Sequence, residues 1–284
     1  MASTPFSSLD DYIALPRVEG LALSPDGTRV VLTVATLKKD ATGYERALWA
    51  VPADGSGAPV RLTRSAKGES GASFTASGDV LFVSARPDVE GDADDESGQL
   101  WLLPAAGGEA RAVTRLAGGV GGVAATAEAS DRVVLAAELL PGADTLEAEA
   151  ALRARRREKK VSAILHETYP VRYWDHDLGP AEPHLLALDL GGLADALPVR
   201  GAAAASSEVD AAATAATASG VDDKAPAPYA PELPRPRDLT PQPGRSADVA
   251  GAALSPDGST LVASMRVSEQ RDGRYVLVGI DTES

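Results

Sequence analysis

Three histidines are the residues of this chain best suited to acid–base or metal chemistry: His166, His176 and His184. Their spacings of 10 and 8 residues place no two of them on one turn of a helix, which favours structural or surface histidines over metal ligands. The chain has no cysteine, so a thiolate metal site and a disulfide framework are excluded. We therefore expect no metal site and no cofactor.

Serine chemistry would need a nucleophile presented on a sharp turn of the form Gly-x-Ser-x-Gly. The two nearest segments, GESGA at 68–72 and GRSAD at 244–248, lack the final glycine. Strands and helices also do not alternate as they do in an α/β-hydrolase sheet. The sequence thus predicts no catalytic residue and no hydrolase domain within these 284 residues.

The carboxylates do not form an obvious site either. Glu147 and Glu149 are two residues apart, so a helix would point them to different faces. The acidic stretch PDVEGDADDESG, residues 87–98, lacks the glycine and glutamate positions of a calcium-binding loop. We expect it to form the charged tip of a hairpin.

Composition describes an ordinary globular protein with an acidic surface. The chain is 44% hydrophobic and 24% charged, and its net charge of −14 argues against general binding of nucleic acid. The first 18 residues have neither the basic start nor the apolar run of a signal peptide, and no apolar run is long enough to cross a bilayer. We expect a cytoplasmic protein with no nucleic-acid or membrane partner.

A repeated sequence pattern indicates the strands that must position any functional residue. LALSPDG at 21–27 recurs as AALSPDG at 252–258, and each copy precedes an apolar run. Gly27 and Gly78 are 51 residues apart, Trp49 and Trp101 are 52 apart, and Thr63 and Thr114 are 51 apart. A fixed period of this length is typical of repeat architectures.

Each unit reads as four short strands: one before a turn, one after it, one carrying Leu-Trp, and one ending in Leu-Thr or Val-Thr. Four antiparallel strands per repeat indicate a blade of a β-propeller. We predict an all-β, incomplete propeller of about three and a half blades, at residues 18–64, 70–115, 120–241 and 248–284. The alternative is a β-sandwich of generic hairpins.

The third unit contains two insertions. Residues 143–183 are predicted to form a helical arm, with Asp144 as N-cap, acidic residues early and basic residues late, as suits a helix dipole. The arm could be a solvated helix on the rim or a docking surface for an acidic partner or a substrate carboxylate. Residues 201–236 are rich in Ala, Ser, Thr and Pro and are predicted to be a disordered loop.

The repeat sequence resembles that of the N-terminal propeller in the prolyl oligopeptidase family. Within that family it is most similar to the branch of acylaminoacyl-peptidases and dipeptidyl aminopeptidases. The turns SPDG, the strand ALWAVPADG and the ending RLT carry the resemblance, and the most specific segment is YPVRYWDHDLG at 169–179. Periplasmic Tol-type and other propellers share the turns, and the context from Arg172 to His176 makes the resemblance more specific.

The resemblance implies a serine peptidase whose propeller covers a C-terminal α/β-hydrolase domain and controls the access of peptides to it. This chain would then be a propeller segment without a catalytic site, and its partners would be that hydrolase domain and the peptide substrate. The residues implied as substrate or domain contacts are Arg172, Trp174 and His176. The alternative is a stand-alone propeller that serves as a binding platform.

Overall fold

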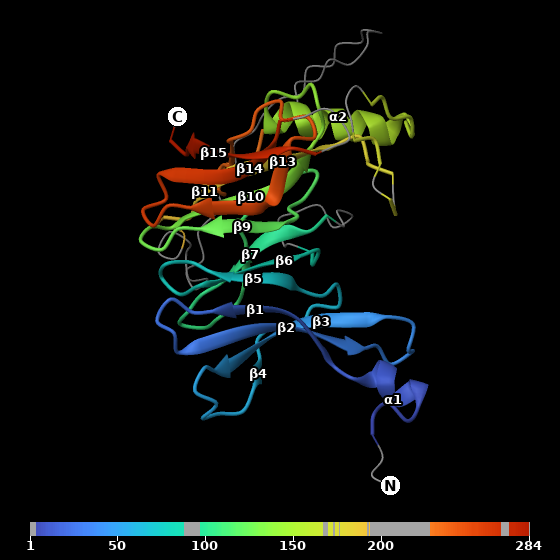
Figure 1. Ribbon diagram of the computed structural model, residues 1–284, viewed down its shortest axis with the longest axis vertical. Helices are drawn as coiled ribbons and strands as arrows, with labels where there is room; N and C mark the ends of the chain where they lie inside the picture. Colours follow the sequence, from blue (N-terminus) through green and yellow to red (C-terminus); the bar gives the residue numbers. More distant parts are fainter. Residues whose placement is uncertain are drawn as a thin grey trace, which may run out of the picture.

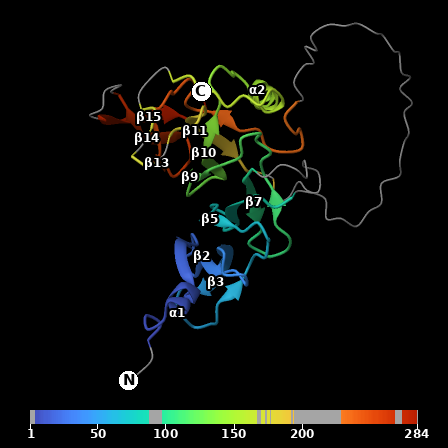
Figure 2. The same cartoon turned by 90° about the vertical axis from the view of Figure 1, so that its right-hand side faces the viewer.

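The computed structural model describes residues 4–87, 97–166, 170–172, 174–175, 177–191, 193, 228–267 and 273–283. Four antiparallel sheets follow one another in chain order along a single row (Figures 1 and 2). We number these sheets blades 1 to 4. No helix in the described ranges is long and apolar enough to span a membrane.

Blades 1 to 3 each have four strands and blade 4 has three. Blade 1 contains β1 (Arg17–Leu23), β2 (Arg29–Leu37), β3 (Tyr44–Pro52) and β4 (Val60–Arg61). Blade 2 contains β5 (Ser70–Phe74), β6 (Val80–Ser84), β7 (Gln99–Leu103) and β8 (Arg111–Ala112). Blade 3 contains β9 (Gly122–Thr126), β10 (Arg132–Leu139), β11 (Glu182–Asp189) and β12 (Arg237–Asp238). Blade 4 contains β13 (Ala247–Leu254), β14 (Thr260–Arg266) and β15 (Tyr275–Asp281).

The first strands of successive blades lie against one another, in the order β1, β5, β9 and β13. Within each blade the remaining strands follow in chain order toward the outside. This is the arrangement of propeller blades, and the row is open at both ends over the described residues. The predicted all-β, incomplete propeller of about three and a half blades is confirmed.

Alternate residues of a strand contact different neighbouring blades. In β6, Val80 and Phe82 pack in a cluster shared with blade 1, whereas Leu81 packs in a cluster shared with blade 3. Because side chains alternate between the two faces of a strand, a strand between two blades needs apolar residues at every position. This explains the uninterrupted apolar runs of the sequence.

The repeated landmarks occupy equivalent places. Trp49 lies in β3 opposite Leu32, and Trp101 lies in β7 opposite Phe82. The carboxylate of Asp26 accepts hydrogen bonds from the Ser24 hydroxyl and the Thr28 N–H, and Asp257 does the same in blade 4.

In the described ranges, the helices α1 (Leu9–Ala14) and α2 (Leu146–Glu158) accompany the blades near opposite ends of the row (Figure 1). The predicted helical insertion in blade 3 is confirmed, with helix at 146–158 of the range 143–183, but the predicted N-cap is wrong. Its N-cap is Thr145 rather than Asp144: the Thr145 hydroxyl accepts the N–H of Ala148.

The predicted disordered loop 201–236 lies outside the described residues as far as 227. Residues 228–236 contradict the prediction, because they are held against blades 2 and 3. Tyr229 packs on the apolar cluster shared by these blades, and Arg235 pairs with Glu147 of α2.

Candidate functional site

The arm that begins with α2 is the candidate site, and it is fixed to the blades by buried charges. Glu149 is 3% exposed and pairs with Arg153 one turn later. An Nη2 hydrogen of Arg153 is donated to the carbonyl oxygen of Glu138, at 2.6 Å, and its guanidinium lies against Gly118. The absence of a side chain at Gly118 lets the helix approach blade 3 closely.

A second set of contacts fixes the start of α2. Glu147 accepts two hydrogen bonds from Arg235, at 2.6 and 2.8 Å, and a third from the N–H of Tyr229 at 3.0 Å. These bonds, first those from Arg235 and then that from Tyr229, hold the pKa of Glu147 well below its usual range. Burial raises the pKa of the Tyr229 hydroxyl, which accepts the N–H of Arg115.

The exposed side of the arm is basic and apolar. Arg155, Arg157, Lys159 and Lys160 are all exposed near the end of the helix or directly after it. Val161 and Leu165 follow, with exposed fractions of 44% and 83%. Cations beside exposed apolar groups can contact an acidic surface.

Two of the predicted contact residues, Arg172 and Trp174, lie on a tight turn after this stretch. The backbones of Arg172 and Asp177 form an isolated bridge, and the N–H of Leu178 donates to the carbonyl of Val171 at 3.1 Å. Trp174 stands at the tip of the turn and is 93% exposed. His176 lies outside the described residues. The structure places Arg172 and Trp174 on one turn, and their role as contacts stays a prediction.

The other two histidines lie apart from each other. His166 is exposed, whereas His184 of β11 is 5% exposed, with its Nδ1 2.9 Å from Oδ2 of Asp238 in β12. Asp238 also accepts the N–H of Thr240, so this pair ties the last two strands of blade 3 together. In the part of the chain that the structure describes, no group of three or more His, Asp and Glu residues could hold a metal ion.

Two hollows lie between blades 1 and 2, with volumes of about 360 and 370 Å³. The first contains Glu69, which is 1% exposed and accepts hydrogen bonds from the Thr63 hydroxyl and the Ser65 N–H. The second lies between the turn of Asp26 and that of Gly78. Glu69 is thus bonded to the segment that follows β4, and Asp26 is bonded within its own turn.

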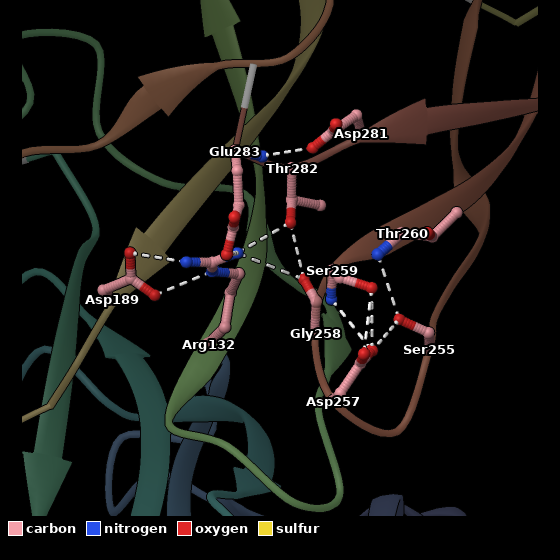
Figure 3. Close-up of polar contacts among 10 residues, drawn as sticks. All are labelled: Arg132, Asp189, Ser255, Asp257, Gly258, Ser259, Thr260, Asp281, Thr282 and Glu283. Carbon is pink, nitrogen blue, oxygen red and sulfur yellow. Dashed lines mark hydrogen bonds and ion pairs between the residues drawn. The ribbon is translucent and has the colours of Figure 1, made fainter.

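Sequence reasoning missed an arginine that joins two blades. Arg132, the first residue of β10, donates to both carboxylate oxygens of Asp189, to the Thr282 hydroxyl at 2.9 Å and to the Gly258 carbonyl at 3.4 Å (Figure 3). Arg29, at the corresponding position of β2, donates to the carbonyl of Gly78 in blade 2. Arginine at the same position of two units was the signal in the sequence.

No protein-family model matches the chain, and no curated protein matches it. Among solved structures, the chain is similar to an acylaminoacyl peptidase of Pyrococcus horikoshii, with a TM-score of 0.53 and 9% identity over 96% of this chain and 32% of that chain. It is also similar to a protein of Bacteroides ovatus assigned as a dipeptidyl aminopeptidase IV, with a TM-score of 0.45 and 10% identity over 94% of this chain and 28% of that one. The chain spans about a third of the length of these structures. The first likeness establishes the propeller fold and nothing finer.

Proposed function

We propose that this chain is the propeller segment of a serine peptidase of the prolyl oligopeptidase family, and that it controls the access of peptides to an α/β-hydrolase domain. The observation that carries the proposal is the fold likeness, which covers almost this whole chain but only about a third of an acylaminoacyl peptidase. The segment YPVRYWDHDLG supports it from the sequence side, because it resembles the third blade of bacterial members.

In this proposal the reaction is peptide hydrolysis by acyl transfer to a serine outside these 284 residues. The blades contribute a rigid wall, and the arm contributes the exposed turn of Arg172 and Trp174. A large exposed aromatic beside a cation is suited to contact a peptide or a neighbouring domain. His176 is proposed as a third contact, and a cytoplasmic location belongs to the same proposal.

The test begins with the reading frame that encodes the chain. If the frame continues into a domain with Gly-x-Ser-x-Gly, the complete product should cleave acylaminoacyl- or aminoacyl-anilides and should be labelled by a serine-reactive phosphonate. The variants R172A and W174A should then lower kcat/KM while leaving phosphonate labelling intact. Labelling and cleavage by the 284-residue chain alone would overturn the proposal.

The second candidate is a stand-alone propeller that serves as a binding platform. The basic and apolar side of the arm favours it, since Leu165 and Trp174 are both more than four-fifths exposed. A frame with no hydrolase domain would favour this candidate. The 284-residue chain would then be expected to bind an acidic protein, and a variant with Arg155, Arg157, Lys159 and Lys160 changed to Gln should bind it more weakly.

A further inference from the structure

The segment that presents Trp174 has a closed backbone. The N–H of Leu178 donates to the carbonyl of Val171 at 3.1 Å, and the backbones of Arg172 and Asp177 form a bridge. The side chains of Arg172 and Asp177 also face each other, with Nε and Oδ1 3.4 Å apart. We call the described residues of this segment the contact turn: 170–172, 174–175 and 177–179.

The contact turn has a buried base and an exposed tip. Pro170 and Leu178 are buried at the base, whereas Trp174 at the tip is 93% exposed. The ion pair of Arg172 and Asp177 is also exposed, and exposed pairs contribute little to stability. The position of Trp174 therefore depends on the contacts that hold the base of the turn.

One such contact comes from the connection between blades 3 and 4. Nη2 of Arg245 donates a hydrogen bond to the carbonyl of Gly179, the residue directly after Leu178. Arg245 lies between β12 and β13, 66 residues further along the chain than Gly179. A hydrogen bond from a guanidinium group is charge-assisted and stronger than a bond between neutral groups, so it is suited to hold a backbone carbonyl in place.

The connection that carries Arg245 is itself held in place. The N–H and the hydroxyl of Ser246 both donate to the carbonyl of Pro243, at 3.0 and 2.5 Å. The carbonyl of Ser246 accepts the N–H of Arg266 at 2.7 Å, which ties the connection to the end of β14 in blade 4. The guanidinium of Arg245 thus extends from a closed turn that is bonded to the next blade.

We propose that Arg245 is a positioning residue for Trp174: by holding the carbonyl of Gly179, it fixes the contact turn relative to blades 3 and 4. The inference rests on the proposed function for the role of Trp174 as a contact, and it names the residue that keeps this contact in place. Because the turn is already ordered, binding of a partner to Trp174 does not have to offset the cost of ordering it. Loss of the Arg245 bond should weaken the contact without removing a group that touches the partner.

Hydrogen exchange of the 284-residue chain, followed by NMR, tests whether Arg245 holds the turn. The variant R245A should speed exchange of the Leu178 amide by about tenfold or more, while the amides of β10 and β11 keep their rates. An unchanged Leu178 amide would show that Arg245 does not hold the turn. Equally faster exchange in β10 and β11 would also contradict the proposal, because blade 3 as a whole would then have opened.

R235A is the matched control on the same arm. Arg235 pairs with Glu147 at the start of α2, and Glu147 also accepts the N–H of Tyr229. This change should speed exchange of the Tyr229 amide and leave the Leu178 amide at its rate. If R235A and R245A sped the Leu178 amide equally, the effect would not be specific to the bond from Arg245.

Lysine at position 245 separates the hydrogen bond from the rest of the side chain. Arg245 uses one nitrogen, Nη2, for the bond to Gly179, and lysine keeps a cationic donor at the end of a long side chain. R245K should therefore keep the exchange rate of the Leu178 amide within about threefold of the unchanged chain, whereas R245M should behave like R245A. Equal rates in R245K and R245M would exclude the donated bond as the cause.

The complete product of the reading frame tests the consequence for the contact. R245A should raise KM for the anilide substrates by about threefold or more and leave kcat within about twofold, because no group at the reacting bond changes. W174A should raise KM as well, and the double variant should be no worse than W174A, since Arg245 acts through Trp174. Additive effects, or a KM that changes in W174A but not in R245A, would refute the positioning role. If the frame contains no hydrolase domain, the proposed function fails, and the exchange rates still decide whether Arg245 holds the turn.

Discussion

The hydroxyl of Thr114 is a small group on which the attachment of β8 depends. It accepts the N–H of Leu100 and donates to Oε1 of Gln99, both at 2.9 Å, and Thr114 is fully buried. Valine has nearly the same shape but cannot make either bond. A buried N–H without a partner costs more than the bond itself contributes, because its desolvation is not compensated.

We expect T114V to lower the free energy of unfolding by about 1–3 kcal/mol. Urea unfolding followed by tryptophan fluorescence measures the change. T36V is the matched control, since Thr36 is exposed and its hydroxyl lies 3.5 Å from its nearest acceptor, the Glu45 carbonyl. That variant should stay within about 0.5 kcal/mol of the unchanged protein. Equal effects of the two changes would mean that the bonds of the Thr114 hydroxyl add nothing to stability.

Asp26 gives the first turn a dependence on pH. Hydrogen bonds from the Ser24 hydroxyl, then from the backbone and hydroxyl of Thr28, lower the pKa of this carboxyl to about 2. A carboxyl with a lowered pKa in the folded state stabilises the fold above its unfolded pKa of about 4, and this contribution is lost as the pH falls through the folded value. Asp257 makes the same bonds in blade 4, and its pKa is also lowered to about 2.

The prediction is that D26N is less stable than the unchanged protein at pH 6 and that the difference shrinks as the pH falls below about 4. Asparagine keeps an acceptor oxygen but has no charge to lose. Urea midpoints between pH 6 and pH 3 measure the difference. A difference that stayed constant over this range would show that the charge of Asp26 does not stabilise the turn.

At the scale of elements, the turns of blades 1 and 4 share a sequence but not an environment. Gly27 and Gly258 have φ angles of +72° and +81°. A Cβ atom on Gly27 would meet nothing within 4 Å, whereas one on Gly258 would lie 2.7 Å from the Ser130 hydroxyl and 3.0 Å from Cβ of Arg132. The turn of blade 4 thus packs against blade 3, and the turn of blade 1 is open on this side.

We expect G27A to cost about 1–2 kcal/mol, the strain of a left-handed conformation at a residue with a side chain. G258A should cost about 1–3 kcal/mol more, because the added methyl group must displace the neighbouring blade. Thermal unfolding of the two variants in parallel measures the difference. If both lost the same stability, the contact between the turn of blade 4 and blade 3 would be unimportant.

Strands and helices could be predicted from the sequence where a local motif or a periodic pattern marked them. The spacing of 51 or 52 residues located blades 1 and 2, since Trp49 and Trp101 had to occupy the same strand of their units. The cap of α2 was predicted one residue early, because Asp144 and Thr145 are both good caps and nothing local decides between them. Composition also failed to predict the order of residues 228–236. Tyr229 and Arg235 hold this segment in place through contacts with residues far away in the sequence.

At the scale of the whole molecule, the order of the blades follows from the repeat, but the contacts between blades do not. Arg29 and Arg132 were visible as arginines at the start of apolar strands. Their acceptors, the carbonyls of Gly78 and Gly258, belong to the next blade, and no local pattern identifies a backbone carbonyl as a partner. The contact role of the turn with Arg172 and Trp174 could be predicted only from the family resemblance. The spacing of these two residues does not by itself indicate a binding site.

Arg29 and Arg132 couple the stability of one blade to that of the next. In a repeat array each unit is stabilised mainly by its neighbours, so the loss of one interface should open the units nearest to it. The side chain of Arg132 is 16% exposed and joins blade 3 to one end of blade 4, where Gly258 of the β13–β14 turn and Thr282 after β15 lie side by side. Arg29 joins blade 1 to blade 2 with one bond of 3.0 Å to Gly78 and a contact with the ring of Phe74.

We therefore expect R132A to speed amide exchange in β13–β15 by roughly 10- to 100-fold, the effect of losing about 1–3 kcal/mol at one interface, while β1–β4 exchange as before. R29A is the matched control at the same position of blade 1, and it should speed exchange in β1–β4 and leave β13–β15 unchanged. Peptide-resolved hydrogen exchange by mass spectrometry distinguishes the two patterns. If either variant sped exchange equally in all four blades, the array would open as one cooperative unit, and the arginines would stabilise the molecule as a whole rather than the interfaces that they span.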